Sequence, residues 1–297
     1  GLSFFDKLAH ELEHFSAEDR ECFFRSDDAK TIASHESNGA ATARAVLIDM
    51  EPKVVDQCVG NAGRTSGGLP WQYDDANVVC EQSGSGTSSM NHYQPFHHVL
   101  SYQPIIPSRN NWAYGYAVHG AACHEAVLDV VRKEVERCDY FKGFLALQSL
   151  AGGTGSGLGT IGWIPTASLG LRELYPTSYL LNTVVWPYRS GEVIVQNYNT
   201  LLTMACLSES SDGVLIVEND LADQICRRLL AIPTPSLHQM NQVLTNHIAA
   251  MLMPALPFQK DTHTSRFSSC ALPSIIQHLC AHPGFKLLNV KLVPQVR

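Results

Sequence analysis

The sequence has no long basic block, no apolar run long enough to cross a membrane and no Cys-x-x-Cys pair. The first absence, together with a formal net charge of −7, argues against a nucleic-acid-binding surface. The second excludes a membrane-spanning helix, which needs about 18 or more apolar residues. The nine cysteines are scattered and odd in number, so we expect a reduced, cytosolic protein rather than a disulfide scaffold or a zinc site.

Two features are also missing at the N-terminus. The first residues lack the charged, apolar and small-residue segments of a signal peptide. The chain opens on Gly1 rather than on methionine, so we expect its natural start to lie further upstream. What is present is ordinary globular material, since 45% of the 297 residues are hydrophobic, enough for one or two domains.

The apolar periodicity predicts helices and strands that alternate along the chain. We expect helices over 2–15, 121–138, 193–207, 221–230 and 237–253, and strands over 45–48, 144–147, 179–186, 213–217 and 285–292. In the helix over 121–138, the apolar stripe consists of Val127, Val131 and Val135, and the residues expected to face solvent are Arg132, Lys133 and Glu134. The alternation predicts an α/β fold with a doubly wound, mainly parallel sheet.

Ligands of such sheets bind beyond the carboxyl ends of the strands. Polar residues follow several of the expected strands: Asp49, Glu51, Ser149, Glu192 and Asn219. We therefore expect these residues to converge on one site.

The stretch Leu147–Thr160, LQSLAGGTGSGLGT, follows an expected strand and precedes a possible helix. A glycine turn at a helix start offers backbone N–H groups to a phosphate, and Thr154 and Ser156 add hydroxyl donors. The stretch is not a Walker A motif, because no Gly-Lys-Ser/Thr follows. The alternative is a connector whose glycines serve only tight packing.

A formal G-x-G-x-x-G also occurs at Gly157, Gly159 and Gly162. It would indicate an NAD(P)-dependent oxidoreductase, but the next expected strand ends in Trp186-Pro187 rather than in an acid that binds ribose. No acid–base pair supports that function either, so we disfavour it.

The acids Asp49 and Glu51 allow two interpretations. One of them could hold Mg²⁺ at the phosphates, because carboxylate oxygens suit that ion. Alternatively, a loop acid caps the helix that begins near Pro52 and Lys53.

Several motifs in register carry a resemblance to a known family. They are ARAVLIDMEPKVV, NNWAYGYAVHG, AGGTGSG, WPYRSGEVIVQNYNTLL and SSDGVLIVENDLADQICRRL. Together they resemble the tubulins, and DMEPKV, WPYRSGEVIVQNYN and HPGFKLL resemble the delta class of that family most. The resemblance covers nearly the whole chain and corresponds to the N-terminal half of a tubulin. It implies a GTP-binding domain over 1–232, then the core helix and the start of the intermediate domain over 233–297.

The resemblance also implies binding roles, with GTP and Mg²⁺ as cofactors. The loop that holds the phosphates matches Ser149, Gly153, Thr154 and Gly155, and the acid near Mg²⁺ matches Glu51.

The ribose-contacting loop matches Glu192 and Gln196, although Gln196 stands where common tubulins have Glu. The two asparagines that read guanine match Asn219 and Asn241. Leu237 stands where common tubulins stack a tyrosine on the base.

Three departures from the family are visible. The family's first strand and its Gln-Cys phosphate loop are expected before Gly1. An insert, Thr87–Arg109, separates SGSG from NNWA; it is either a surface loop, a wrongly included exon, or a metal site formed by its histidines His92, His97 and His98. Pro165, after the glycine stretch, suggests a local irregularity.

Hydrolysis is the least supported activity. Where family members supply an acid to a neighbour's GTP, the matching position is Ser274, a poor general base, and His278 is the best substitute nearby. We therefore assign no catalytic residue and expect at most slow hydrolysis. The resemblance implies other tubulins and the microtubule lattice as partners, and a location in the cytoplasm, cytoskeleton, centriole, cilium or nucleus. A pseudo-GTPase scaffold without nucleotide remains an alternative.

Overall fold

The computed structural model describes residues 1–12, 17–25, 40–64, 68–80, 110–161, 170–191, 193–253 and 271–292. A four-stranded parallel sheet lies at its centre, in the order β6-β7-β8-β9. Its strands are β6 (Gly143–Ser149), β7 (Tyr179–Trp186), β8 (Gly213–Glu218) and β9 (Leu287–Asn289). Four expected strands are thus confirmed, the last of them shorter than expected.

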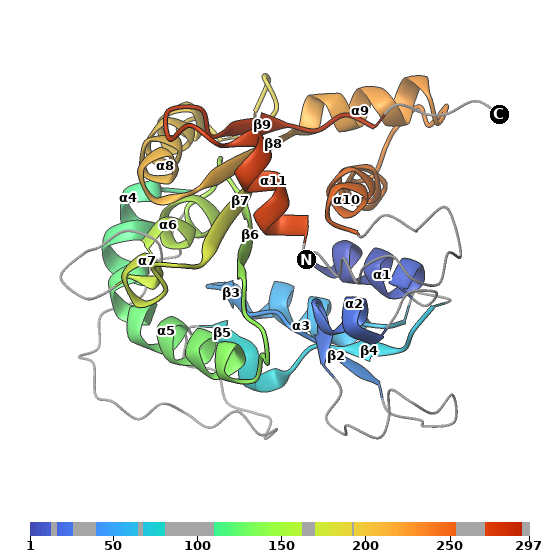
Figure 1. Ribbon diagram of the computed structural model, residues 1–297. Coiled ribbons are helices and arrows are strands. Elements are labelled where there is room, and N and C mark those ends of the chain that lie inside the picture. The colour runs from blue at the N-terminus through green and yellow to red at the C-terminus, as the bar shows by residue number, and fades with distance from the viewer. Residues whose placement is uncertain are drawn as a thin grey trace, which may run out of the picture.

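Helices cover both faces of this sheet (Figure 1). Leu181 and Leu215 belong to one hydrophobic core together with residues of the helices α1 (Leu2–Glu11), α10 (Leu237–Leu252) and α11 (Ala271–Leu279). Val184 and Val214 pack on the other side against α8 (Gln196–Ser210). Because successive side chains of a strand point to opposite faces, this division confirms the doubly wound α/β fold.

The N-terminal part adds two smaller sheets. β3 (Leu47–Asp49) pairs in parallel with β5 (Val78–Cys80). β2 (Ala41–Ala43) lies between β1 (Phe24–Arg25), which is antiparallel to it, and β4 (Trp71–Gln72), which is parallel. Mutual aromatic contacts fill the space between them and α1, from Phe5, Phe24, Trp71 and Tyr73.

The remaining helices follow local signals. α3 (Pro52–Asn61) has Pro52 at its first position, where a missing N–H costs nothing. A capping box between Ser236 and Gln239 starts α10. The other elements are α2 (Ala17–Glu21), η2 (Asp75–Asn77), α4 (Trp112–Tyr114), η3 (Gly115–Gly120), α5 (Ala121–Glu136), η4 (Thr154–Leu158), α6 (Gly159–Ile161), α7 (Leu171–Leu174) and α9 (Asn219–Arg228).

Some expectations need correction. The helix expected over 193–207 begins at Gln196 and runs to Ser210, and the helix expected from 221 already begins at Asn219. Glu134 was expected to face solvent with Arg132 and Lys133, but Glu134 is only 7% exposed. Its burial has a physical reason, because arginines from two other segments lie against it.

Within the described ranges, no helix is both long and apolar enough to cross a membrane. Each cysteine in those ranges is a free thiol. Four sequence predictions fall outside the described residues: the 87–109 insert with its histidines, Gly162, Pro165 and Glu192.

Candidate functional site

The carboxyl ends of three parallel strands meet at one edge of the central sheet. Ser149 at the end of β6 lies opposite Val185, and Trp186 at the end of β7 lies opposite Glu218. Asn219 follows Glu218 directly and opens α9. The fold therefore brings together the ends of β6, β7 and β8, as the sequence predicts.

The glycine loop begins at the end of β6. Ser149 is exposed, and its Oγ accepts a hydrogen bond from the Ala151 N–H at 3.3 Å. Gly153 is the N-cap of η4 and supplies no side-chain cap to its first N–H groups. Such N–H groups at a helix start suit an anion. The expectation for Ser156 was wrong, because its side chain is buried and its hydroxyl donates to the Gly152 carbonyl.

The glycines in this loop and at Gly115, which packs against it, serve two different purposes. A Cβ on Gly157 would lie 2.3 Å from the Trp112 carbonyl oxygen, and one on Gly115 would lie 2.2 Å from the Gly153 oxygen. Both glycines are therefore needed for packing, as the connector interpretation holds. A Cβ on Gly152 would meet nothing nearer than the Asn110 Oδ1 at 3.8 Å, so this part of the loop is open.

The two acids after β3 differ in environment. Asp49 is half-buried, and its Oδ1 accepts from the Met50 N–H at 2.7 Å. Burial raises the pKa of Asp49, the backbone N–H groups of Met50 and Glu51 oppose that rise, and the Glu51 charge adds to it. Glu51 is exposed at the N-cap of α3 and makes no side-chain cap hydrogen bond. Its carboxylate is therefore available to a cation.

The described residues offer few ligands for a metal ion at the site after β3. Across the described part of the chain, no three His, Cys, Asp or Glu residues are grouped so that they could hold a metal. The carboxylates of Asp49 and Glu51 are nevertheless ligands of the kind that Mg²⁺ takes, because proteins usually hold that ion through one or two carboxylates together with ligand phosphates and water.

The predicted ribose and base residues are placed as follows. Gln196 is buried, and its Nε2 donates to the Tyr188 carbonyl at 3.0 Å. Asn219 is half-buried and Asn241 exposed, and neither side chain forms a hydrogen bond within the described ranges. Leu237 is 72% exposed and lies one turn before Asn241 on the same face of α10.

Sequence reasoning missed Asn199, which is 3% exposed in the first turn of α8. Its Nδ2 donates to the carbonyls of Asn110 and Ala151, both at 2.7 Å, and its Oδ1 accepts from the Trp112 N–H at 3.1 Å. We call residues 110–116, residues 151–157 and Asn199 the loop junction. Asn199 lies within one of the family-like motifs, but only its contacts distinguish it from its neighbours.

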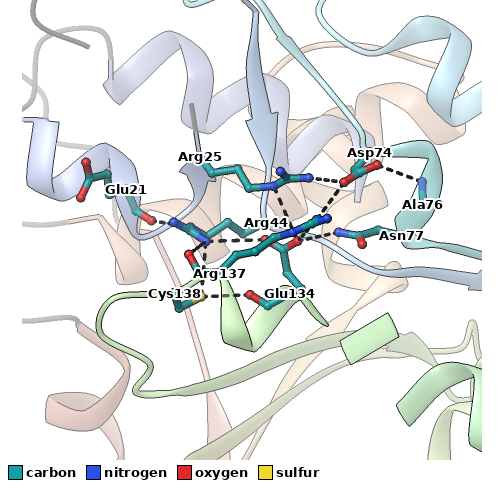
Figure 2. A network of polar contacts seen from close by, with 9 residues as sticks. All are labelled: Glu21, Arg25, Arg44, Asp74, Ala76, Asn77, Glu134, Arg137 and Cys138. Atoms are coloured by element: carbon teal, nitrogen blue, oxygen red, sulfur yellow. Dashed lines mark hydrogen bonds and ion pairs between the residues drawn. The ribbon is translucent and has the colours of Figure 1, made fainter. Parts of the chain in front are cut away.

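A second polar cluster lies at the C-terminal end of α5 (Figure 2). We call it the charged clasp, formed by Arg25, Arg44, Asp74, Glu134 and Arg137. Glu134 Oε2 lies 3.6 Å from Arg25 Nε, and its Oε1 lies 3.6 Å from Arg44 Nη1. The Asn77 side chain donates to Glu134 Oε2 at 2.8 Å.

Asp74 completes the clasp. It pairs with Arg25 and lies 3.0 Å from Arg137 Nη1, and its Oδ1 accepts from the Ala76 N–H at 2.9 Å. Burial alone would raise the pKa of Asp74, but the Ala76 N–H and the two guanidinium groups together hold it below its usual value. The clasp therefore fastens β1, and Arg44 directly after β2, to the C-terminal end of α5.

A small cavity of about 10 Å³ lies beside the C-terminal end of β8. It is lined by residues of β8, α9, α10 and β9, among them Ile216, Glu218, Leu221, Val243, His247 and Val290. This volume is enough for about one water molecule and far too small for a nucleotide.

Comparison with known proteins decides the family. The model of the Tubulin/FtsZ family, GTPase domain, matches residues 1–227. The chain belongs to the tubulin/FtsZ family. The tubulin delta chain of Macaca fascicularis is 38% identical over 286 residues, which cover 96% of this chain and 54% of that protein. The human tubulin delta chain has the same identity and coverage.

A relative from another class is more distant. The tubulin beta-1 chain of Colletotrichum gloeosporioides is 32% identical over 254 residues, 84% of this chain and 49% of that protein. The chain spans about half the length of the curated relatives it matches. The tubulin-type α/β fold expected from the motifs is thus confirmed.

Proposed function

We propose that the chain binds GTP with Mg²⁺ and forms the nucleotide-binding part of a delta-type tubulin. The observation that carries this proposal is the glycine loop at the end of β6, beside the ends of β7 and β8. An uncapped helix start there suits phosphates, and Glu51, Asn219 and Asn241 occur in the order along the chain that the resemblance to tubulins implies.

Each part of the nucleotide has proposed partners in this chain. The phosphates are held by Ser149, Gly153, Thr154 and Gly155, with Glu51 near Mg²⁺. The ribose is contacted by Glu192 and Gln196. Guanine is read by Asn219 and Asn241, whose amides offer both a donor and an acceptor. Within the described ranges neither asparagine side chain is held by a hydrogen bond, which supports the base-reading role.

The wider role follows from the relatives. Those named tubulin delta chain and tubulin beta-1 chain support a cytoskeletal function in the cytoplasm with other tubulins as partners. We place that function at the centriole, basal body and cilium. We further propose that residues 1–232 form the nucleotide-binding domain, with α10 and the start of an intermediate domain in 233–297.

We propose that the chain supplies no efficient activating acid to the GTP of a neighbouring tubulin, and that its own hydrolysis of GTP is slow. Ser274 is half-buried in α11 and carries no charge that could activate water. Gln277 is engaged, since its Nε2 donates to the Tyr179 hydroxyl at 2.6 Å. His278 is exposed in the last turn and is the remaining candidate for proton transfer.

Nucleotide identity is the decisive test. Acid extraction of the purified chain followed by chromatography should release guanine nucleotide. Nicotinamide would contradict the proposal, and a chain that carries no nucleotide and binds none when GTP and Mg²⁺ are added would instead support the pseudo-GTPase scaffold.

Base recognition is tested by a matched pair on α10. Asn241→Ala should weaken GTP binding by about tenfold, because an unmet hydrogen bond costs about 1–3 kcal/mol. Asn246→Ala, exposed on another face of the same helix, should leave the GTP affinity unchanged. Equal competition by ATP and GTP for the unmodified chain would show that the base is not read.

A further inference from the structure

The loop junction contains one side chain that binds three separate backbone groups. Asn199 uses both hydrogens of its amide on the carbonyls of Asn110 and Ala151, and it uses its oxygen on the Trp112 N–H. Its own backbone is fixed in α8, where its N–H donates to Val195. The side chain is therefore a rigid buried link between the glycine loop and the segment that opens α4.

The contact to Trp112 has a local reason. Trp112 is the first residue of α4, so its N–H has no partner within the helix, and Asn199 supplies one. Asn110 has a φ of 57°, a left-handed conformation that asparagine tolerates better than most residues. Its carbonyl is fixed in that conformation by Asn199.

The contact to Ala151 has a consequence for the glycine loop. All described peptide bonds are trans, so the Ala151 carbonyl and the Gly152 N–H point to opposite sides of their shared peptide plane. Because the carbonyl is held toward α8 by Asn199, the Gly152 N–H points away from α8. That N–H makes no hydrogen bond within the described ranges, and the one atom near a Cβ on Gly152 would be the Asn110 Oδ1 at 3.8 Å, so the described part of the chain leaves room beside this residue.

We propose that Asn199 is a positioning residue for the phosphates, because it fixes the Ala151–Gly152 peptide so that the Gly152 N–H faces the anion. This inference rests on the proposed GTP binding and deepens it. Without the Asn199 amide, the peptide is free to rotate and the N–H is no longer held ready. A neutral amide suits this task, since it adds no charge beside the phosphates.

The inference predicts a selective loss of affinity. Asn199→Ala should weaken GTP binding by about 10- to 100-fold, the range expected for a hydrogen bond to a charged group. Binding of guanosine, which has no phosphate, should stay unchanged. Asn199→Asp should behave at least as badly, because its carboxylate faces two carbonyl oxygens and can donate to neither.

The control is another buried asparagine with a purely structural contact. Asn182 is fully buried in β7, and its Nδ2 donates to the Ser211 hydroxyl at 2.8 Å. Asn182→Ala should lower the thermal midpoint as Asn199→Ala does, but it should keep the ratio of guanosine to GTP affinity of the unmodified chain.

The experiment measures GTP binding by titration calorimetry and guanosine binding by competition, on the full chain and all three variants. Circular dichroism confirms that each variant is folded. If Asn199→Ala and Asn199→Asp keep GTP affinity, or lose GTP and guanosine affinity equally, the positioning role is overturned while the proposed function stands. If the unmodified chain binds no GTP, the proposed function fails and this role fails with it.

Discussion

The charged clasp and the loop junction solve the same problem with different chemistry. Each ties together segments that are distant in sequence. The clasp joins residues between Arg25 and Arg137, and the junction joins residues between Asn110 and Asn199. The clasp uses guanidinium and carboxylate groups, whereas the junction uses one neutral amide and closely packed backbone. Burying charged groups carries a large desolvation penalty, which their mutual attraction offsets only when every partner is present. The neutral groups of the junction add no charge beside the glycine loop, where we propose that the phosphates bind.

Removing the central acid of the clasp should have the largest effect. Glu134→Ala removes the buried carboxylate that faces Arg44, while Arg25 keeps its ion pair with Asp74, so we expect a loss of about 3 kcal/mol in the free energy of unfolding. Urea denaturation measures it. Glu136→Ala removes an exposed ion pair with Arg132 from the same helix and should cost less than about 1 kcal/mol. Equal losses for the two variants would show that the clasp contributes no more to the free energy of unfolding than an exposed ion pair does.

Overfilling the junction should have the next largest effect. A methyl group on Gly157 would meet the Trp112 carbonyl oxygen at 2.3 Å, so Gly157→Ala should cost about 1–3 kcal/mol. Gly152→Ala, whose Cβ has room, should change the thermal midpoint little. If Gly157→Ala proved as stable as Gly152→Ala, the close backbone approach at the junction would not be required.

Replacing Asp74 should have the smallest effect on the free energy of unfolding, and the size of this effect should depend on pH. Asp74→Asn keeps the oxygen that accepts from Ala76 but loses the charge that faces Arg25 and Arg137, at a cost of about 1 kcal/mol near neutrality. Because the folded-state pKa of Asp74 is lowered, its contribution is complete above the unfolded pKa of about 3.9. It disappears as the pH falls through the folded-state pKa.

Denaturation at pH 7 and near pH 3 should therefore show a difference between the unmodified chain and Asp74→Asn that shrinks in acid. A difference of constant size would mean that shape rather than charge matters at this position. The junction has no titratable group in its hydrogen bonds, so Asn199→Ala should lose similar stability at both pH values.

The main elements were predictable because their signals are local. Apolar runs and helical periodicity predicted β6, β7, β8 and α10 to within a few residues. The glycine loop and the polar strand ends were predictable for the same reason, since they directly follow those strands. The two-residue strands β1 and β4 were not, because so few residues show no period and their pairing depends on contacts across the chain.

Individual side chains were harder to place than elements. Glu134 and its neighbours Arg132 and Lys133 look alike in sequence, yet only Glu134 is buried. Ser156 resembles a ligand donor, but its hydroxyl donates to the Gly152 carbonyl. A polar side chain takes the partner that the fold brings to it, and those partners come from other segments or from the exact path of the loop.

The sequence by itself therefore determined the α/β alternation, the position of the glycine loop and the motifs of the tubulin family, because hydrophobic periodicity and motif spacing are properties of neighbouring residues. Only the tertiary structure decided that Asn199 links the glycine loop to α4, that Gly157 packs on Trp112 and that Glu134 is buried among arginines. Each of these contacts joins residues dozens of positions apart. Long-range packing creates such pairs, and no local pattern encodes them.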